Sequence, residues 1–145
     1  MDLSRDYVNA ALSSKLIQDN WLPGMYDMVY NPKKDEIFYL SWDDYLKVKN
    51  NPELKKSVLF IPQEGNMNAI YHAIKEPEFP HIATERCVEL DLEFNERWER
   101  LAKEESKKYA NFERILKTKE RQQLYFLMKY YEKKEFPGIV LLSNN

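Results

Sequence analysis

The spacing of the apolar residues changes along the chain. Short alternating or continuous apolar runs lie in the first half, at Met25–Tyr30, Ile37–Leu40 and Val58–Ile61, whereas the last third repeats apolar residues every three or four positions. The first pattern is typical of β-strands and the second of amphipathic helices. Such a chain is expected to form an α+β fold, with a small, mainly antiparallel sheet packed with helices and a helical C-terminal third.

The first two runs predict a β-hairpin. Tyr26, Met28 and Tyr30 fall on one face of the first strand, and the polar stretch 31–36 separates it from the second strand. A polar turn between two apolar runs is a hairpin signal. The third run, 58–61, is followed by Pro62, which ends the strand.

Three helices are expected in this half, at residues 4–19, from Ser41 to about Lys49, and at 67–74. Ser41 followed three residues later by Asp44 forms a capping box, and Asn50-Asn51-Pro52 ends that helix. Met67, Ile70, Tyr71 and Ile74 form a helical stripe.

The segment Cys87–Leu92 fits two periods. Val88, Leu90 and Leu92 alternate with acidic residues, as in a half-buried strand, whereas Leu90 also starts a helical stripe that continues through residue 101. We expect a strand to about Leu92, followed by a helix with a break near Ser106.

The chain's last helix is predicted to begin at Thr118, a suitable N-cap, and to end at Pro137-Gly138. Ile139–Leu142 is expected to add an edge strand. The 145 residues favour a single domain, 1–145, with a hairpin-containing part (1–75), a linker (76–86) and a mostly helical part (87–145).

Composition excludes several kinds of site. Three glycines cannot build a glycine-rich phosphate loop, and one cysteine with two histidines cannot build a thiolate-rich zinc site. No metal or cofactor is expected. The lone cysteine fits a reducing compartment, and the N-terminus lacks the basic and apolar regions of a secretory signal. No apolar run reaches the roughly 18 residues of a membrane span, so a cytoplasmic protein without a membrane partner is expected.

His81 and Cys87 are the only candidates for a nucleophile and its base. The sequence around them matches no nucleophile motif, which favours a structural cysteine and a surface histidine instead. Asp43-Asp44 could contribute to a magnesium site, but adjacent helical residues diverge, and carboxylates at a helix N-terminus need no further explanation.

A basic stretch lies in the last third, where residues 93–145 carry 12 basic and 9 acidic residues, against 10 and 15 in residues 1–92. Basic side chains attract phosphates and aromatic rings stack on bases, so the stretch is a candidate nucleic-acid site. The alternative, a solvated helix face with its aromatics in the core, is favoured by the spacing of Tyr109, Phe112 and Leu116. The candidate residues are Lys107, Lys108, Tyr109, Arg114, Lys117, Lys119 and Arg121.

Aromatic residues are abundant, with ten Tyr, seven Phe and three Trp. Tyrosine and tryptophan are enriched at protein interfaces. This composition favours a non-enzymatic accessory or protein-interaction module with a protein partner of unknown identity. A nucleic-acid-binding protein is the alternative and a cysteine-dependent hydrolase the third hypothesis. The C-terminal helices could also pair with a second copy of the chain.

Four short motifs occur in a fixed order along the chain: Trp21-x-Pro23, Val29-Tyr30-Asn31, the Leu59–Gly65 region with Pro62 and Gln63, and the C-terminal Met128-Lys129 followed by Tyr131. Together they resemble a group of small uncharacterised phage and prophage proteins of Gram-positive bacteria. The chain departs from that group because 62–66 lacks the group's arginine and second glutamine. The resemblance implies a phage or prophage origin and a location in the host cytosol, and no activity.

Overall fold

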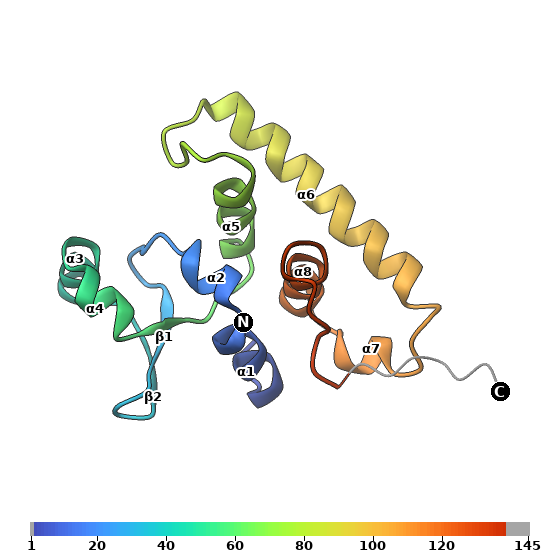
Figure 1. Ribbon diagram of the computed structural model, residues 1–145, viewed down its shortest axis with the longest axis horizontal. Helices are drawn as coiled ribbons and strands as arrows, with labels where there is room; N and C mark the ends of the chain where they lie inside the picture. The colour runs from blue at the N-terminus through green and yellow to red at the C-terminus, as the bar shows by residue number, and fades with distance from the viewer. Residues whose placement is uncertain (1, 139–145) are drawn as a thin grey trace.

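The computed structural model describes residues 2–138, and it has the α+β architecture expected from the sequence. The strands are β1 (Met28–Asn31), β2 (Glu36–Tyr39) and β3 (Leu59–Phe60). The helices are α1 (Arg5–Ser13), α2 (Lys15–Asp19), α3 (Trp42–Asn50), α4 (Pro52–Lys56), α5 (Asn66–Lys75), α6 (Thr84–Glu105), α7 (Phe112–Ile115), α8 (Lys119–Leu127) and the π-helical η1 (Met128–Glu132). Figure 1 shows the hairpin, α3 and α4 at one end of the molecule, and α6 and α7 at the other.

The predicted hairpin is confirmed. β1 and β2 are antiparallel, with Val29 opposite Phe38, and β3 joins the other side of β1 through Val29 opposite Phe60. The strand order is therefore β2-β1-β3, which leaves β2 at an edge. The first strand is shorter than expected because residues 25–26 lie in a turn.

The predicted helix at 4–19 is wrong in one respect, since it breaks at Ser14 into α1 and α2. Ser14 has an extended backbone, and its hydroxyl accepts a hydrogen bond from the Ile17 N–H (3.2 Å). The same hydroxyl donates to Glu132, which lies far along the chain. A serine that caps a new helix in this way interrupts the earlier one.

The predicted cap of α3 is confirmed, because the Ser41 hydroxyl accepts from the Asp44 N–H (3.2 Å). Asn50-Asn51-Pro52 ends that helix as predicted. The same residues also begin the short helix α4, which was not predicted from the sequence. The Asn51 side chain accepts from the backbone N–H of Glu53 (3.0 Å), and Pro52 occupies the first helical position, where its missing N–H costs nothing.

The strand predicted for Cys87–Leu92 is wrong, because α6 runs without interruption from Thr84 to Glu105. α6 therefore begins inside the predicted linker 76–86. Leu90 and Phe94 are fully buried, whereas Val88 and Leu92 are 53% and 67% exposed. The alternation that suggested a strand thus arises from two apolar residues on the solvent side of a helix. The break expected near Ser106 is present, because α6 ends at Glu105 and the next helix, α7, begins only at Phe112.

Thr118 caps α8 as predicted, accepting from the Arg121 N–H (3.2 Å). The helical segment ends at Glu132, where Lys133 turns to φ 59°, and not at Pro137-Gly138 as predicted. The strand predicted at Ile139–Leu142 lies outside the described residues.

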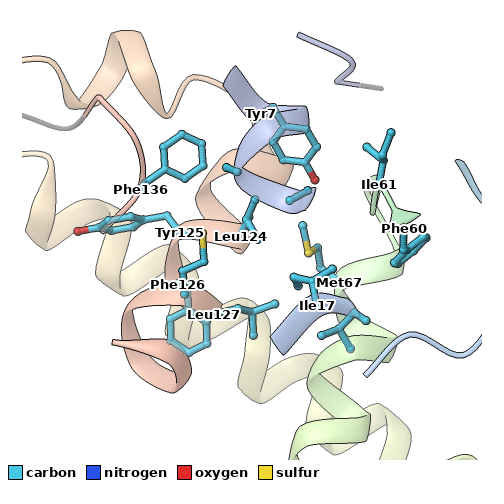
Figure 2. Close-up of a cluster of buried hydrophobic side chains, with 14 of the residues drawn as sticks. Tyr7, Ile17, Phe60, Ile61, Met67, Leu124, Tyr125, Phe126, Leu127 and Phe136 are labelled. Carbon is cyan, nitrogen blue, oxygen red and sulfur yellow. The ribbon is translucent and has the colours of Figure 1, made fainter. Parts of the chain in front are cut away.

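α8 and the turn after it form the centre of the fold. Residues 123–128 are buried in succession, and a helix that is buried all round must lie between other elements. Figure 2 shows Leu124 and Leu127 directed toward Tyr7, Ile17 and Met67, which come from α1, α2 and α5. α6 packs against α8 from another side. Burial of each large apolar side chain contributes roughly 1.5–3 kcal/mol.

Candidate protein-interaction surface

The loop before β1 is organised by the carboxylate of Asp27. Its Oδ2 accepts hydrogen bonds from the indole Nε1 of Trp21 (2.8 Å) and from the backbone N–H of Gly24 (2.8 Å). Burial raises the pKa of Asp27, and the two hydrogen bonds offset only part of that rise. A short loop closed around one partly buried side chain is held in a single conformation.

Tyr26 is the residue that this loop presents. Its φ is +69°, in the left-handed region, where an L-residue with a side chain costs roughly 1–3 kcal/mol. Its N–H donates to the Leu40 carbonyl (2.9 Å), and the N–H of Leu40 donates to the Asp27 carbonyl (2.9 Å), so the backbone is fixed on both sides. The ring is 67% exposed. Strain of this kind persists only where the surrounding structure enforces it.

Further apolar side chains are exposed at the same end of the hairpin. The 2.9 Å bond between Tyr26 and Leu40 places this loop beside the end of β2 and the start of α3. Single exposed apolar residues are ordinary, whereas a group of them marks an interaction site. We call the group the hairpin-end surface: Leu22, Met25, Tyr26, Tyr39 and Trp42.

The edge of β2 continues this surface. The Met28 carbonyl accepts from the Ile61 N–H (2.9 Å) and therefore points toward β3. Because backbone groups alternate in direction along a strand, Tyr39, opposite Met28, points its own N–H and C=O away from β1, and so does Ile37. Within residues 2–138, β1 is the only strand paired with β2.

A cleft of about 360 Å³ lies between the hairpin and the α3–α4 pair. Phe38, Val48 and Val58 supply apolar lining, while Lys34, Lys47, Glu36 and Asp44 line it with both signs of charge. Mixed charge over apolar lining suits a polypeptide segment better than a single anion.

The structure does not join the two residues of the predicted nucleophile pair. His81 is exposed in the loop before α6, and Cys87 lies half-buried on α6. No hydrogen bond links them among the described residues. Asp43 and Asp44 lie in the first turn of α3, and the described residues contain no group of three or more His, Cys, Asp or Glu that could hold a metal ion.

The predicted basic stretch is divided by the fold. Tyr109 and Arg121 are buried, and Phe112 and Tyr125 face the core as well, so none of these rings is available for stacking on bases. Lys108 pairs with Glu105 (3.5 Å) and Lys119 with Glu64 (3.6 Å). Of the basic residues in this stretch, Lys107, Arg114 and Lys117 are exposed and have no ion-pair partner within residues 2–138.

Arg121 has a structural environment that the sequence did not reveal. Its guanidinium donates to Asp2 (2.8 Å), twice to Asp6 (2.6 and 2.7 Å), to the Ile115 carbonyl (2.7 Å) and to Ser4. All five of its donors are therefore used within the chain, and none remains for a phosphate. Burial alone would raise the pKa of Asp2, but hydrogen bonds from Ser4, Arg121 and Thr118 hold it below its ordinary value.

The α5–α6 contact is also polar. His72 Nε2 lies 2.6 Å from Asp91 Oδ1, and the Tyr71 hydroxyl donates to Glu93 (2.7 Å). Arg97 donates to the hydroxyls of Tyr71 (2.9 Å) and Tyr131 (3.0 Å) while its guanidinium lies over the rings of Phe126 and Tyr130. These groups fasten α6 to α5 and to the turn after α8.

No protein-family model, curated protein or solved structure matches the chain. Among residues 2–138, no helix is both long and apolar enough to cross a membrane.

Proposed function

We propose that the protein is a non-enzymatic protein-interaction module that docks its partner on the hairpin-end surface. The observation that supports this most directly is Tyr26, an exposed ring held at a strained backbone angle by a closed loop. A rigid, pre-oriented aromatic side chain loses little conformational entropy on binding, so its buried area contributes to affinity.

A phage or prophage origin and a cytoplasmic location belong to the same proposal. Their support is the resemblance carried by the Trp21-x-Pro23, Leu59–Gly65 and Met128-Lys129 motifs, together with the single cysteine.

Site-specific photo-crosslinking tests the docking surface. A benzophenone amino acid is placed at Tyr26 in one variant and at Leu92 in another, since both side chains are 67% exposed but they lie on different parts of the fold. In cells that carry the gene, we expect a discrete adduct from position 26, competed away by excess unlabelled protein, and none from position 92. Equal labelling at both positions, or labelling from 92 alone, contradicts the proposal.

The nucleic-acid alternative keeps one supporting observation, the unpaired Lys107, Arg114 and Lys117. It predicts binding of a single-stranded oligonucleotide that weakens steeply with salt and is lost in the triple alanine variant. Without exposed rings nearby, the affinity is expected to depend on charge alone, and no binding at low ionic strength would reject this alternative.

A further inference from the structure

We propose that the partner binds through an acidic segment whose apolar side chain enters a pocket between α2 and α4, beside Lys55 and Lys56. This inference rests on the proposed interaction function and names the chemistry of the partner. Two features of the pocket carry it, namely its apolar lining and an excess of positive charge.

The pocket has a volume of about 490 Å³ and lies between the end of α2, α4 and β3. Its apolar lining consists of Trp21, Pro52, Val58 and Leu59. Ordinary ligand sites measure roughly 300–1,000 Å³, so the pocket is large enough for an apolar side chain and its neighbours. Because Trp21 directly precedes Leu22, the pocket adjoins the hairpin-end surface, and one partner can cover both.

The Trp21 wall of the pocket is fixed in place. The Trp21 ring stacks on Phe60, with the ring centroids 5.1 Å apart and the planes 8° from parallel. The Gln18 side chain accepts from the Phe60 N–H (2.7 Å) and donates to the Phe60 carbonyl (2.9 Å). Both backbone groups of Phe60 are therefore occupied, so a partner enters this pocket with a side chain and not as an added strand.

Positive charge is in excess among the residues that line the pocket. These are Asp19, Lys55 and Lys56, whereas Glu53, the acidic residue of α4, does not line it. The Asp19 carboxylate lies 3.9 Å from the Lys15 ammonium, which offsets its charge. Within residues 2–138, neither Lys55 nor Lys56 has an ion-pair partner. Carboxylates of a partner would complement these two ammonium groups.

The position of Lys55 links the charge to the apolar wall. Lysines in the last turn of a helix are favourable wherever that helix lies, and this alone would not place them at a pocket. Lys55 Nζ, however, lies 5.8 Å from the centre of the Trp21 ring. The cleft that shares Val58 with this pocket is lined by two lysines and two acidic residues, so it favours neither sign of charge.

An acidic polypeptide fits the pocket better than a nucleic acid does. A base stacks on an exposed aromatic face, whereas Trp21 is 2% exposed and packs against Phe60. The aliphatic lining from Val58 and Leu59 suits a leucine-sized side chain, and two adjacent lysines suit carboxylates that flank it in sequence.

Heteronuclear NMR of the full chain tests the charge and the apolar anchor separately. The probe is the peptide acetyl-Glu-Glu-Leu-Leu-Glu-Glu-amide, and its two controls replace every glutamate by lysine or both leucines by serine. We expect the probe to shift the Trp21 indole N–H and the backbone N–H groups of Lys56 and Leu59, and its binding to weaken with salt. Equal shifts from either control, or none from the probe, overturn the proposal.

Charge reversal provides a matched mutational test. Lys55→Glu/Lys56→Glu and Lys107→Glu/Lys117→Glu change the net charge equally, but the second pair flanks α7 at the other end of the molecule. We expect the first variant to bind the probe about tenfold more weakly and the second to bind it like the wild type. Lys56→Glu alone leaves Lys55 over Trp21 and should also weaken binding, which guards against a folding defect in the double variant. Equal affinities of the two double variants overturn the proposal.

The outcomes separate this inference from the proposed function. A crosslink from position 26 that is unchanged in Lys55→Glu/Lys56→Glu retains the proposed function and overturns the acidic partner. Probe binding at Trp21 without any crosslink from position 26 supports the pocket as an acidic-peptide site and overturns docking on the hairpin-end surface. A single-stranded oligonucleotide, or a second copy of the chain, that shifts the Trp21 indole N–H when the acidic probe does not would identify a different occupant and overturn the inference.

Discussion

The two ends of the molecule use aromatic and charged residues in opposite ways. At the α6–α8 end they are directed inward, with Arg97 over the rings of Phe126 and Tyr130, and Arg121 holding Asp2 and Asp6. At the end of the molecule that holds the hairpin, called the hairpin end below, Tyr26, Tyr39 and Trp42 are exposed. Lys33 and Lys34, in the turn between β1 and β2, are exposed as well.

This difference shows where the chain can make new contacts. Side chains that already satisfy one another inside the fold can be released only at a cost in stability, whereas exposed rings on a fixed backbone can be covered by a partner at no such cost. The helical end is therefore expected to determine stability and the hairpin end to determine binding.

Arg121→Met gives the largest expected effect. It leaves Asp2 buried without its cation, and removing one partner of a buried ion pair costs about 3–5 kcal/mol. Urea denaturation of this variant and of Arg114→Met, an exposed arginine without an ion pair, measures the contrast. A loss below 1 kcal/mol for Arg121→Met would show that the Arg121 network does not hold the N-terminal segment in place.

Asp27→Ala is expected to have an intermediate effect. It leaves the Trp21 indole and the Gly24 N–H without their acceptor, which costs about 1–3 kcal/mol. Binding through the hairpin-end surface should fall as well, because the loop that orients Tyr26 loses its centre. Asp27→Asn keeps an acceptor oxygen and serves as the control. Unchanged crosslinking from position 26 in the alanine variant would break the link between loop rigidity and binding.

Tyr26→Gly should separate stability from binding. Tyr26→Ala removes the same ring but keeps a side chain at a φ of +69°, and so retains the backbone strain. Glycine tolerates this φ, so the glycine variant should be more stable than the alanine variant by about 1 kcal/mol. Both variants are expected to lose partner binding. Thermal unfolding measures the first difference, and an alanine variant as stable as the glycine variant would remove the evidence for strain.

The pH dependence of stability should have opposite signs at the two ends. Burial alone would raise the folded-state pKa of Asp6, but the hydrogen bond and charge of Arg121 outweigh burial and lower it. The ionised Asp6 therefore stabilises the fold at pH values above the ordinary pKa of 3.8, and this stabilisation is lost as the pH falls through the lowered pKa. The pKa of Asp27 is raised by burial, so its contribution is present below 3.8 and is lost as the pH rises through the raised pKa.

Urea denaturation of Asp6→Asn and Asp27→Asn between pH 2.5 and 6 measures this difference. Relative to wild type, Asp6→Asn should become less stable as the pH rises, and Asp27→Asn should become more stable. The same sign for both variants would contradict the contrast between the two ends.

The parts of the fold that were predictable depend on local signals. The Ser41 and Thr118 caps, the hairpin and the α5 stripe each involve residues a few positions apart, and all are present in the structure. The strand predicted at Cys87–Leu92 failed because Val88 and Leu92 are apolar but face solvent, and no local signal distinguishes such residues from core residues.

The site depended on distant partners. The sequence around Arg121 indicates a surface cation, because its partner Asp2 lies at the opposite end of the sequence and contacts it only in the folded structure. In the sequence, Tyr26 fits the alternating pattern of a strand. In the structure it lies in a turn, which is held by the hydrogen bond from Trp21 to Asp27 and by the hydrogen bond from the Tyr26 N–H to the Leu40 carbonyl. The exposed edge of β2 follows from the strand order, which the positions of the three strands in the sequence did not determine.

Hydroxyl-radical footprinting tests most directly whether binding is confined to the hairpin end. The protein is labelled pure and in an extract of cells that carry the gene, and the oxidation of each side chain is compared by mass spectrometry. We expect protection of Met25, Tyr26 and Trp42 in the extract, with Leu92 and Tyr130 unchanged, although these two are also exposed. Protection of Leu92 or Tyr130 without protection of the hairpin-end surface would contradict binding at the hairpin end.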